Sequence, residues 1–177
     1  MIAGLGVSKL TALYLGPQGI ALLGNLRNSL DIFHKFSSGG LDNAVVKYTA
    51  DYQSNPKMLR QFLSTLIWLG LGSCTLTIAL VFIFSETIND AIFGDKNYVT
   101  VIRILAILLP LHVVNIYFIS ILKGIGEFHK VIRINIASHV LNLIVFALLL
   151  IYIDLEGALL AIIIVPSAML FVTLYHC

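Results

Sequence analysis

Charged side chains are scarce in this sequence. Asp, Glu, Lys and Arg make up 11% of its 177 residues, whereas a soluble domain averages about 25%. Apolar residues reach 59%, and the mean hydropathy is +0.97. This composition excludes an ordinary water-soluble domain, and a net charge of only +2 gives no argument for a nucleic-acid partner. The sequence therefore predicts an integral membrane protein.

Cysteine and the common catalytic motifs are also missing or nearly so. Cys74 and Cys177 are the only two cysteines, and their separation predicts neither a disulfide framework nor a metal-ligand pair. The sequence contains no Walker A loop, no HExxH and no GxSxG, which are the signatures of several large enzyme classes. We therefore expect no catalytic residue, no cofactor and no bound metal, and we expect that the protein is not an enzyme.

Long apolar runs are what the sequence does contain. A helix needs about 20 residues to cross the hydrocarbon core of a bilayer, and the runs predict an all-α, polytopic membrane protein with about six transmembrane helices in one domain, residues 1–177. The expected helices cover residues 1–15, 20–50, 61–84, 99–122, 131–153 and 158–175. Since the first is too short to cross alone, we interpret it as the second half of a helix whose beginning is missing.

The connections between these helices differ in charge. The two turns on one side carry or adjoin six basic residues: Lys47, Lys57, Arg60, Lys123, Lys130 and Arg133. The turns on the opposite side carry one basic and five acidic residues: Lys96, Glu86, Asp90, Asp95, Asp154 and Glu156. Lys and Arg collect in short cytoplasmic loops. The first side is therefore expected to be cytoplasmic, and with six helices both termini lie on that side.

One polar stripe interrupts the apolar pattern between Gly24 and Tyr48. At about 100° per residue, a continuous helix gathers the polar side chains of this segment within an arc of roughly 100°. These side chains are Arg27, Asp31, His34, Lys35, Ser38 and Asp42. A charge that faces lipid at the centre of a bilayer costs about 3 kcal/mol or more, so the stripe predicts a face turned toward a water-filled cavity.

The stripe also has a purely structural interpretation. Arg27 would then pair with Asp31, and Lys35 with Asp31 or Asp42, so that the pairs only neutralise the helix. His34 would be a hydrogen-bonded spacer, although an imidazole is the side chain whose charge changes near neutral pH and is therefore the natural candidate for ion coupling.

Two further features concern helix packing. Residues 37–40, Ser-Ser-Gly-Gly, are expected to kink the 20–50 helix or to let a neighbouring helix approach closely. His112 and Asn115 lie within the 99–122 helix, and we interpret them as residues that hydrogen-bond to neighbouring helices.

Three passages resemble a known family. They are KLTALYLGPQGIALLGNLR, SGGLDNAVVKYTADYQSNPKMLR and EGALLAIIIVP. Together, in this order and over nearly the whole chain, they resemble the Wzx-type lipid-linked oligosaccharide flippases, which belong to the multidrug, oligosaccharidyl-lipid and polysaccharide exporter superfamily. Within that family the likeness is to the flippases for O-antigen and for lipid III of enterobacterial common antigen.

The resemblance implies a fold of two six-helix lobes, of which this chain supplies the N-terminal lobe only. It implies flipping of an undecaprenyl-pyrophosphate-linked oligosaccharide across the bacterial inner membrane for surface polysaccharide biosynthesis, driven by an ion gradient. In that role Arg27, Lys35 and Asp31 would bind the substrate, and Asp31 or His34 would couple ions. The implied partners are the lipid-linked oligosaccharide, the lipid bilayer, a missing C-terminal lobe or a second copy, and a glycan polymerase complex.

Two alternatives stay open. A drug or cation antiporter of the same superfamily would be favoured by an acidic cavity, whereas this stripe carries as many fixed bases as acids. A membrane remnant or scaffold without transport activity belongs to a different functional class. Because the sequence supplies about one lobe, it is expected to be either a truncated fragment or one of two copies that together rebuild a cavity, and the fragment is favoured.

Overall fold

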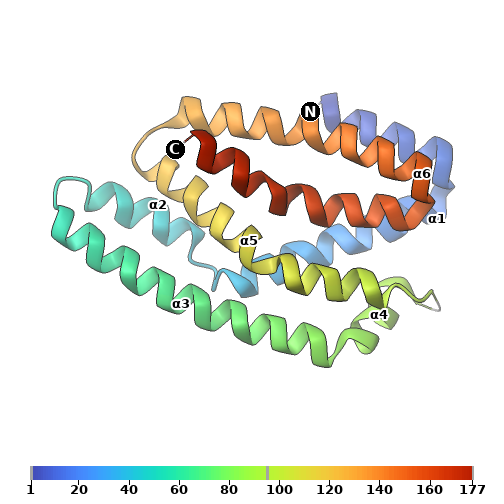
Figure 1. Cartoon of the computed structure of the whole chain (residues 1–177), viewed down its shortest axis with the longest axis horizontal. Coiled ribbons are helices and arrows are strands. Elements are labelled where there is room, and N and C mark those ends of the chain that lie inside the picture. Colours follow the sequence, from blue (N-terminus) through green and yellow to red (C-terminus); the bar gives the residue numbers. More distant parts are fainter. Residues whose placement is uncertain (1, 95, 177) are drawn as a thin grey trace.

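The chain is a bundle of long helices, seen in a computed structural model that describes residues 2–94 and 96–176, without the side chains of residues 2–10, 13, 175 and 176. Met1, Asp95 and Cys177 lie outside the described residues. The helices are α1 (Ile2–Ser37), α2 (Asp42–Asp51), α3 (Pro56–Ile83), α4 (Ser85–Phe93), α5 (Val99–Gly124) and α6 (Phe128–His176) (Figure 1). No strand occurs in the described part, and the all-α prediction is confirmed.

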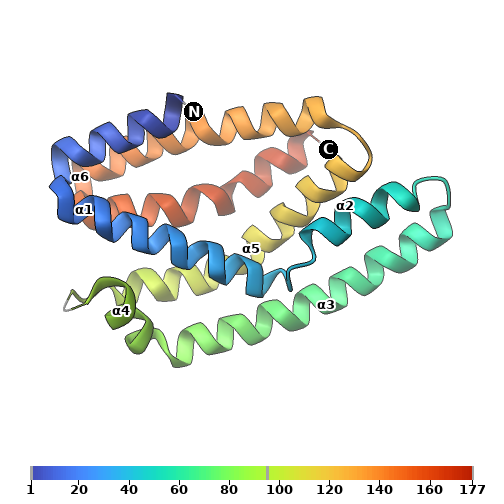
Figure 2. The same cartoon turned by 180° about the vertical axis from the view of Figure 1, so that it is seen from behind.

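Both α1 and α6 reverse direction within their length (Figures 1 and 2). The reversal in α1 is at Gly16, with φ of 65°, a conformation that glycine adopts without steric cost. The following Pro17 occupies the first turn of the second half, where its missing N–H costs nothing. In α6 the reversal is at Asp154, with φ of 57°, and the helix resumes directly. The expected turn at Asp154 is therefore present, but it is shorter than the four residues 154–157.

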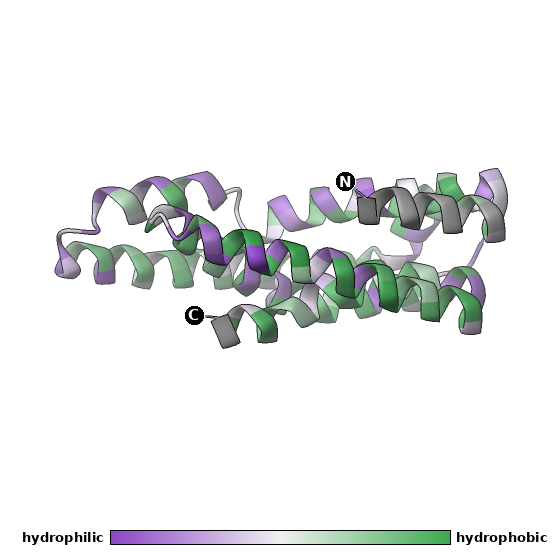
Figure 3. Cartoon of the chain, turned by 90° about the horizontal axis from the view of Figure 1, so that it is seen from above, coloured by the Kyte–Doolittle hydropathy of each residue, from purple (hydrophilic) through white to green (hydrophobic). Residues whose placement is uncertain are grey.

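The membrane-spanning capacity lies in α3, α5 and α6, which are long and apolar enough to cross a bilayer. α3 begins at Pro56, and the Asn55 side chain accepts a hydrogen bond from the Met58 N–H at 3.3 Å. This N-cap starts the helix earlier than the expected residue 61. α1, which carries the polar stripe, is not among the three. Figure 3 shows hydrophobic residues along much of the length of the long helices, and many of their large apolar side chains are exposed, as lipid contact requires.

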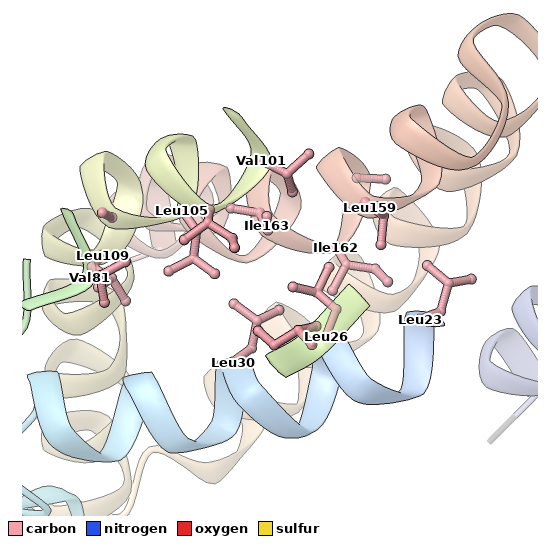
Figure 4. Close-up of a cluster of buried hydrophobic side chains, with 14 of the residues drawn as sticks. Leu23, Leu26, Leu30, Val81, Val101, Leu105, Leu109, Leu159, Ile162 and Ile163 are labelled. Atoms are coloured by element: carbon pink, nitrogen blue, oxygen red, sulfur yellow. The ribbon is translucent and has the colours of Figure 1, made fainter. Parts of the chain in front are cut away.

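The centre of the bundle is α5, which packs against each of the other five helices. Its buried side chains meet those of α1, α3 and the second half of α6 in one apolar core (Figure 4). The core residues labelled in that view are Leu23, Leu26, Leu30, Val81, Val101, Leu105, Leu109, Leu159, Ile162 and Ile163. Leu26 and Ile102 are completely buried, so the orientation of α1 about its own axis is fixed by its leucines.

The two basic turns lie at one end of the bundle (Figure 1). Gln53, between α2 and α3, donates a hydrogen bond to the carbonyl of Ile125, between α5 and α6, at 3.5 Å. The acidic connections lie at the opposite end, where the amide of Asn25 donates to the carbonyl of Ile92 in α4 at 3.2 Å. Which end faces the cytoplasm stays a prediction from the charge bias.

Two segments differ from the sequence-based expectation. Residues 20–50, expected as one kinked helix, form the second half of α1 and the separate helix α2, because Gly39 and Gly40 adopt φ of 60° and 66° and end α1. The expected connection over residues 85–98 contains α4. The assignment of residues 1–177 to one N-terminal lobe stays a prediction.

Candidate functional site

The polar stripe of α1 has three exposed charges. Arg27, Asp31 and Lys35 lie on the surface, while Leu26 and Leu30 are buried against α5 and α6 on the other side of the helix. A spacing of four residues separates successive members of the set by about 6 Å along the helix axis. The three side chains therefore form a line along one face of α1, and we call Arg27, Asp31 and Lys35 the charged face.

The charged face is not neutralised by internal pairing. Within the described part of the chain, the one ion pair joins Lys130 to Glu127 at 3.9 Å, at the basic end of the bundle. The interpretation in which Arg27, Lys35 and Asp31 only pair with one another therefore does not hold in this structure. Exposed i,i+4 pairs stabilise a helix by only a few tenths of a kcal/mol, so little is lost when they are open.

His34 lies apart from the charged face. Its ring stacks on that of His112 in α5, with 3.6 Å between ring centroids and an interplanar angle of 21°. A cavity of about 10 Å³ adjoins the two rings, bordered on the α6 side by Pro166 and Ser167. The Nδ1 atom of His112 is buried and has no hydrogen-bond partner among the described residues.

Sequence reasoning missed this histidine pair. It predicted interhelical hydrogen bonds for His112 and Asn115. The prediction is confirmed for Asn115, which accepts a hydrogen bond from Thr173 of α6 at 2.7 Å, whereas His112 stacks on His34. The two histidines are separated by 78 positions in the sequence, and a helical periodicity gives no information about which helices are neighbours. The signal that was available was the position of His112 inside an apolar helix, where an ionisable side chain is functional by default.

Ser38 and Asp42 do not belong to the charged face. The backbone carbonyl of Ser38 accepts a hydrogen bond from the Tyr117 hydroxyl of α5 at 2.9 Å, in the buried interior. Asp42 is half-buried, and its Oδ1 atom has no hydrogen-bond partner in the described part. Because α1 ends at Ser37, the helical phase restarts in α2, and a side chain at position 42 no longer aligns with Arg27.

The Tyr117 ring also defines how α1, α3 and α5 meet. It lies over Gly70 of α3, where a Cβ atom would come within 2.8 Å of the ring carbon Cε2. The absence of a side chain at Gly70 allows the ring to reach Ser38. This contact, which we call the Tyr117 contact, holds the end of α1 one helical turn beyond His34.

The acidic end contains one titratable group with a shifted pKa. Asn89 accepts a hydrogen bond from the backbone N–H of Tyr98 at 2.7 Å and donates to the carbonyl of Lys96 at 2.9 Å, which fixes the connection between α4 and α5. Burial of the Tyr98 phenol raises its pKa, and the negative charge of Glu156 adds to the effect.

Among the described residues, no group of three or more His, Cys, Asp or Glu side chains is placed to hold a metal ion.

Comparison with known proteins gives a family match. The sequence profile of a family described as "Polysaccharide biosynthesis protein" matches residues 1–176. The chain is 32% identical over 174 residues to the lipid III flippase of Escherichia coli (strain K12), covering 93% of this chain and 40% of that protein. The lipid III flippase of Shigella flexneri gives the same identity and coverage. The chain thus spans about two-fifths of the length of these curated relatives, and no solved structure matches it.

Proposed function

The chain belongs to the polysaccharide biosynthesis protein family, and from this premise we propose that it forms one wall of a passage through which a polyprenyl-pyrophosphate-linked oligosaccharide crosses the bacterial inner membrane. The second wall is a further lobe or a second copy of the chain. The basic end of the bundle is placed in the cytoplasm, and the cargo is an O-antigen or enterobacterial common antigen precursor. The name of the relatives, lipid III flippase, supports this cargo class.

The observation that carries the proposal is the exposed and unpaired charged face. Three charges on a helix packed among apolar spans would be costly against lipid. They are tolerated if the face of α1 that bears Arg27, Asp31 and Lys35 meets water and a polar cargo. The balance of two bases to one acid favours an anionic cargo over a cationic drug.

The chemistry of the three side chains fits a pyrophosphate that must be held and then released. The Arg27 guanidinium presents a planar fork of N–H donors that matches phosphate oxygens. Lys35 lies about 12 Å further along the helix axis and provides a second cationic binding position for the pyrophosphate. Asp31 lies between Arg27 and Lys35 and repels the pyrophosphate, which keeps the cargo from binding too tightly to either cationic side chain. Asp31 and His34 are the groups proposed to take up the coupling ion.

A binding experiment tests the cargo class. The 177-residue chain is placed in lipid nanodiscs, and its affinity is measured for farnesyl pyrophosphate, with farnesol as the uncharged control ligand. We expect Arg27→Gln to weaken pyrophosphate binding at least tenfold, about 1.4 kcal/mol, because it removes the bidentate donor. Arg103→Gln is the matched control, since Arg103 is an exposed arginine on a different helix, α5. Equal affinities for farnesyl pyrophosphate and farnesol, or equal losses in the two variants, would rule out the assignment.

Complementation of a flippase-deficient bacterial strain tests transport itself. The chain and its two arginine variants are expressed at matched levels in the membrane, and surface glycan is measured. Rescue that is lost in Arg27→Gln and kept in Arg103→Gln is the expected result. Pyrophosphate binding without rescue would mean that the wall forms but lacks its partner, whereas membrane insertion without binding or rescue would support an inactive remnant or scaffold.

A further inference from the structure

Three helices meet at the histidine pair, and each is weakened there. His34 lies one turn before α1 ends at Ser37. His112 follows Pro110 of α5 by two residues, and Pro166 of α6 lines the cavity beside both rings. A proline removes a backbone hydrogen bond and is the commonest origin of a helix kink. The pair therefore lies beside the end of α1, one proline of α5 and one proline of α6.

The small cavity beside the rings has room for about one water molecule. The buried Nδ1 atom of His112 has no hydrogen-bond partner in the described part, and buried polar atoms of this kind are usually satisfied by protein or by ordered water. A water molecule in this cavity would also connect the rings to the Ser167 hydroxyl on the α6 side. A water molecule in the cavity could thus deliver a proton to the Nδ1 atom of His112.

The charged and titratable groups around the pair are few. Among the residues that line the cavity, only His34 and His112 titrate, and α3 and α4 contribute no side chain to it. From α6 the neighbours are Pro166 and Ser167, which carry no charge. Asp31 is an acid whose charge acts on His112, and Lys35 is the next residue after His34 but is exposed at the surface.

Stacking at 3.6 Å is compatible with neutral rings and incompatible with two charged ones. Like charges at this separation repel strongly in a medium of low dielectric. Two imidazolium rings would also need four hydrogen-bond acceptors, whereas the cavity lining contributes the Pro166 backbone near His112 and the Ser167 hydroxyl. When the rings separate, each gains access to water and can accept a proton through the lone pair of a ring nitrogen. Proton uptake and separation of α1 from α5 are therefore linked.

We propose that His34 and His112 form a proton-binding site that is closed and proton-free when the rings stack, and that opens the contact between α1 and α5 when protons are taken up from water. The ligand is the proton itself, and the site adjoins the charged face, because His34 directly precedes Lys35 and follows Asp31 by about one helical turn. Its part in driving transport rests on the function proposed above, whereas proton binding and opening do not.

Amide hydrogen exchange of residues 34–40 measures the opening. The N–H groups of Ser38 and Gly40 donate to the carbonyls of His34 and Lys35 at 2.9 Å each, so they exchange when the end of α1 separates. Below about pH 6.5, where a water-exposed imidazole takes up its proton, the open population rises about tenfold per pH unit for one proton. After correction for the intrinsic exchange rate, we expect this rise in the native chain in nanodiscs.

Phenylalanine variants provide the comparison. His34→Phe with His112→Phe keeps two stacked rings and removes both titrating groups, so the pH dependence should disappear. His139→Phe is the matched control, because His139 is an exposed histidine of α6, and it should keep the tenfold rise. If the double variant does not insert into membranes, His34→Gln with His112→Gln serves, since it also removes both titrating groups.

A second measurement follows the rings directly. Nitrogen-15 NMR of histidine-labelled chain reports protonation of each imidazole. We expect His34 and His112 to gain protons over the same pH range in which residues 34–40 begin to exchange. A double variant that retains the tenfold rise, or a native chain whose rings gain protons with no change in exchange, would overturn the proposal. Farnesyl pyrophosphate binding in the same samples separates the two hypotheses, because its absence beside an intact proton response refutes only the cargo.

Discussion

Replacing Gly70 by alanine is expected to destabilise the chain through the Tyr117 contact. A Cβ at this position would lie 2.8 Å from Cε2 and 2.9 Å from the hydroxyl of Tyr117, closer than unstrained packing allows. The ring must therefore turn away, and its hydroxyl then loses the 2.9 Å hydrogen bond to the Ser38 carbonyl. Because the Tyr117 ring is displaced and loses its hydrogen bond, the expected loss of stability is larger than the crowding by one methyl group alone would cause.

The magnitude follows from three opposing terms. Overpacking in a core costs about 1–3 kcal/mol, and a buried hydrogen bond left unmade costs about 1–3 kcal/mol more. Glycine to alanine inside a helix gains about 1 kcal/mol in propensity. The expected net loss for Gly70→Ala is therefore about 1–5 kcal/mol. Gly72→Ala is the matched control on the same helix, since a Cβ there meets nothing within 4 Å, and it should be neutral or stabilising.

Thiol labelling of buried Cys74 provides the assay. In a Cys177→Ser background, its labelling rate against the SDS fraction in mixed micelles reports unfolding, because Cys74 is 5% exposed in the fold. Tyr117→Phe completes a double-mutant cycle, since it removes the hydroxyl that both partners contact. The two changes should couple by at least about 0.5 kcal/mol. Strictly additive losses, or a Gly70→Ala variant as stable as Gly72→Ala, would refute the role of the Tyr117 contact.

Two other predictions concern the acidic end. Asp154→Gly should raise stability by about 1 kcal/mol in the same labelling assay, because a non-glycine residue at φ of 57° stores about 1–3 kcal/mol of backbone strain; an unchanged or lower stability would contradict this. Burial, reinforced by Glu156, raises the pKa of Tyr98, so the folded state prefers the neutral phenol. Its contribution is complete below about pH 10, the ordinary tyrosine value, and is lost as pH rises through the higher folded-state pKa. Stability scans from pH 9 upward should therefore fall less steeply for Tyr98→Phe than for the native chain, and parallel curves would exclude the effect.

Much of the fold could be predicted because membrane helices are long and apolar. A continuous run of about 20 apolar residues has few structural options in a bilayer, so the runs near α3, α5 and α6 were identified, although α6 continues through the expected four-residue turn with a break only at Asp154. The resemblance to a flippase family, drawn from three passages, is confirmed by the family match over residues 1–176 together with the 32% identity to two lipid III flippases. The short α4 was missed because its nine residues carry no such signal and depend on tertiary contacts such as the bond from Asn25 to Ile92.

The candidate site was predictable only in part. A helical projection assigned Arg27, Asp31 and Lys35 to one face because α1 is regular across those positions. The same projection failed for Asp42, since it assumed an unbroken helix through the glycines at 39 and 40. It also could not pair His34 with His112, because that contact depends on how α1 and α5 cross. Local periodicity gives the face of a helix, whereas packing decides what that face meets.

The central position of α5 has a consequence for synthesis at the ribosome. Every other helix packs against it, yet its last residue, Gly124, emerges only after two-thirds of the chain has been made. Until then α1, α2 and α4 can pack against α3, and α1 against α4, but none of them has its contact with α5. The leucines of α1 that α5 buries are therefore still uncovered, and the orientation of its charged face is not yet fixed. Nascent chains that stop before Val99 should therefore need an insertase or chaperone to escape degradation. In chains that extend past Gly124, all of the helices α1 to α5 should become resistant to proteolysis at the same chain length.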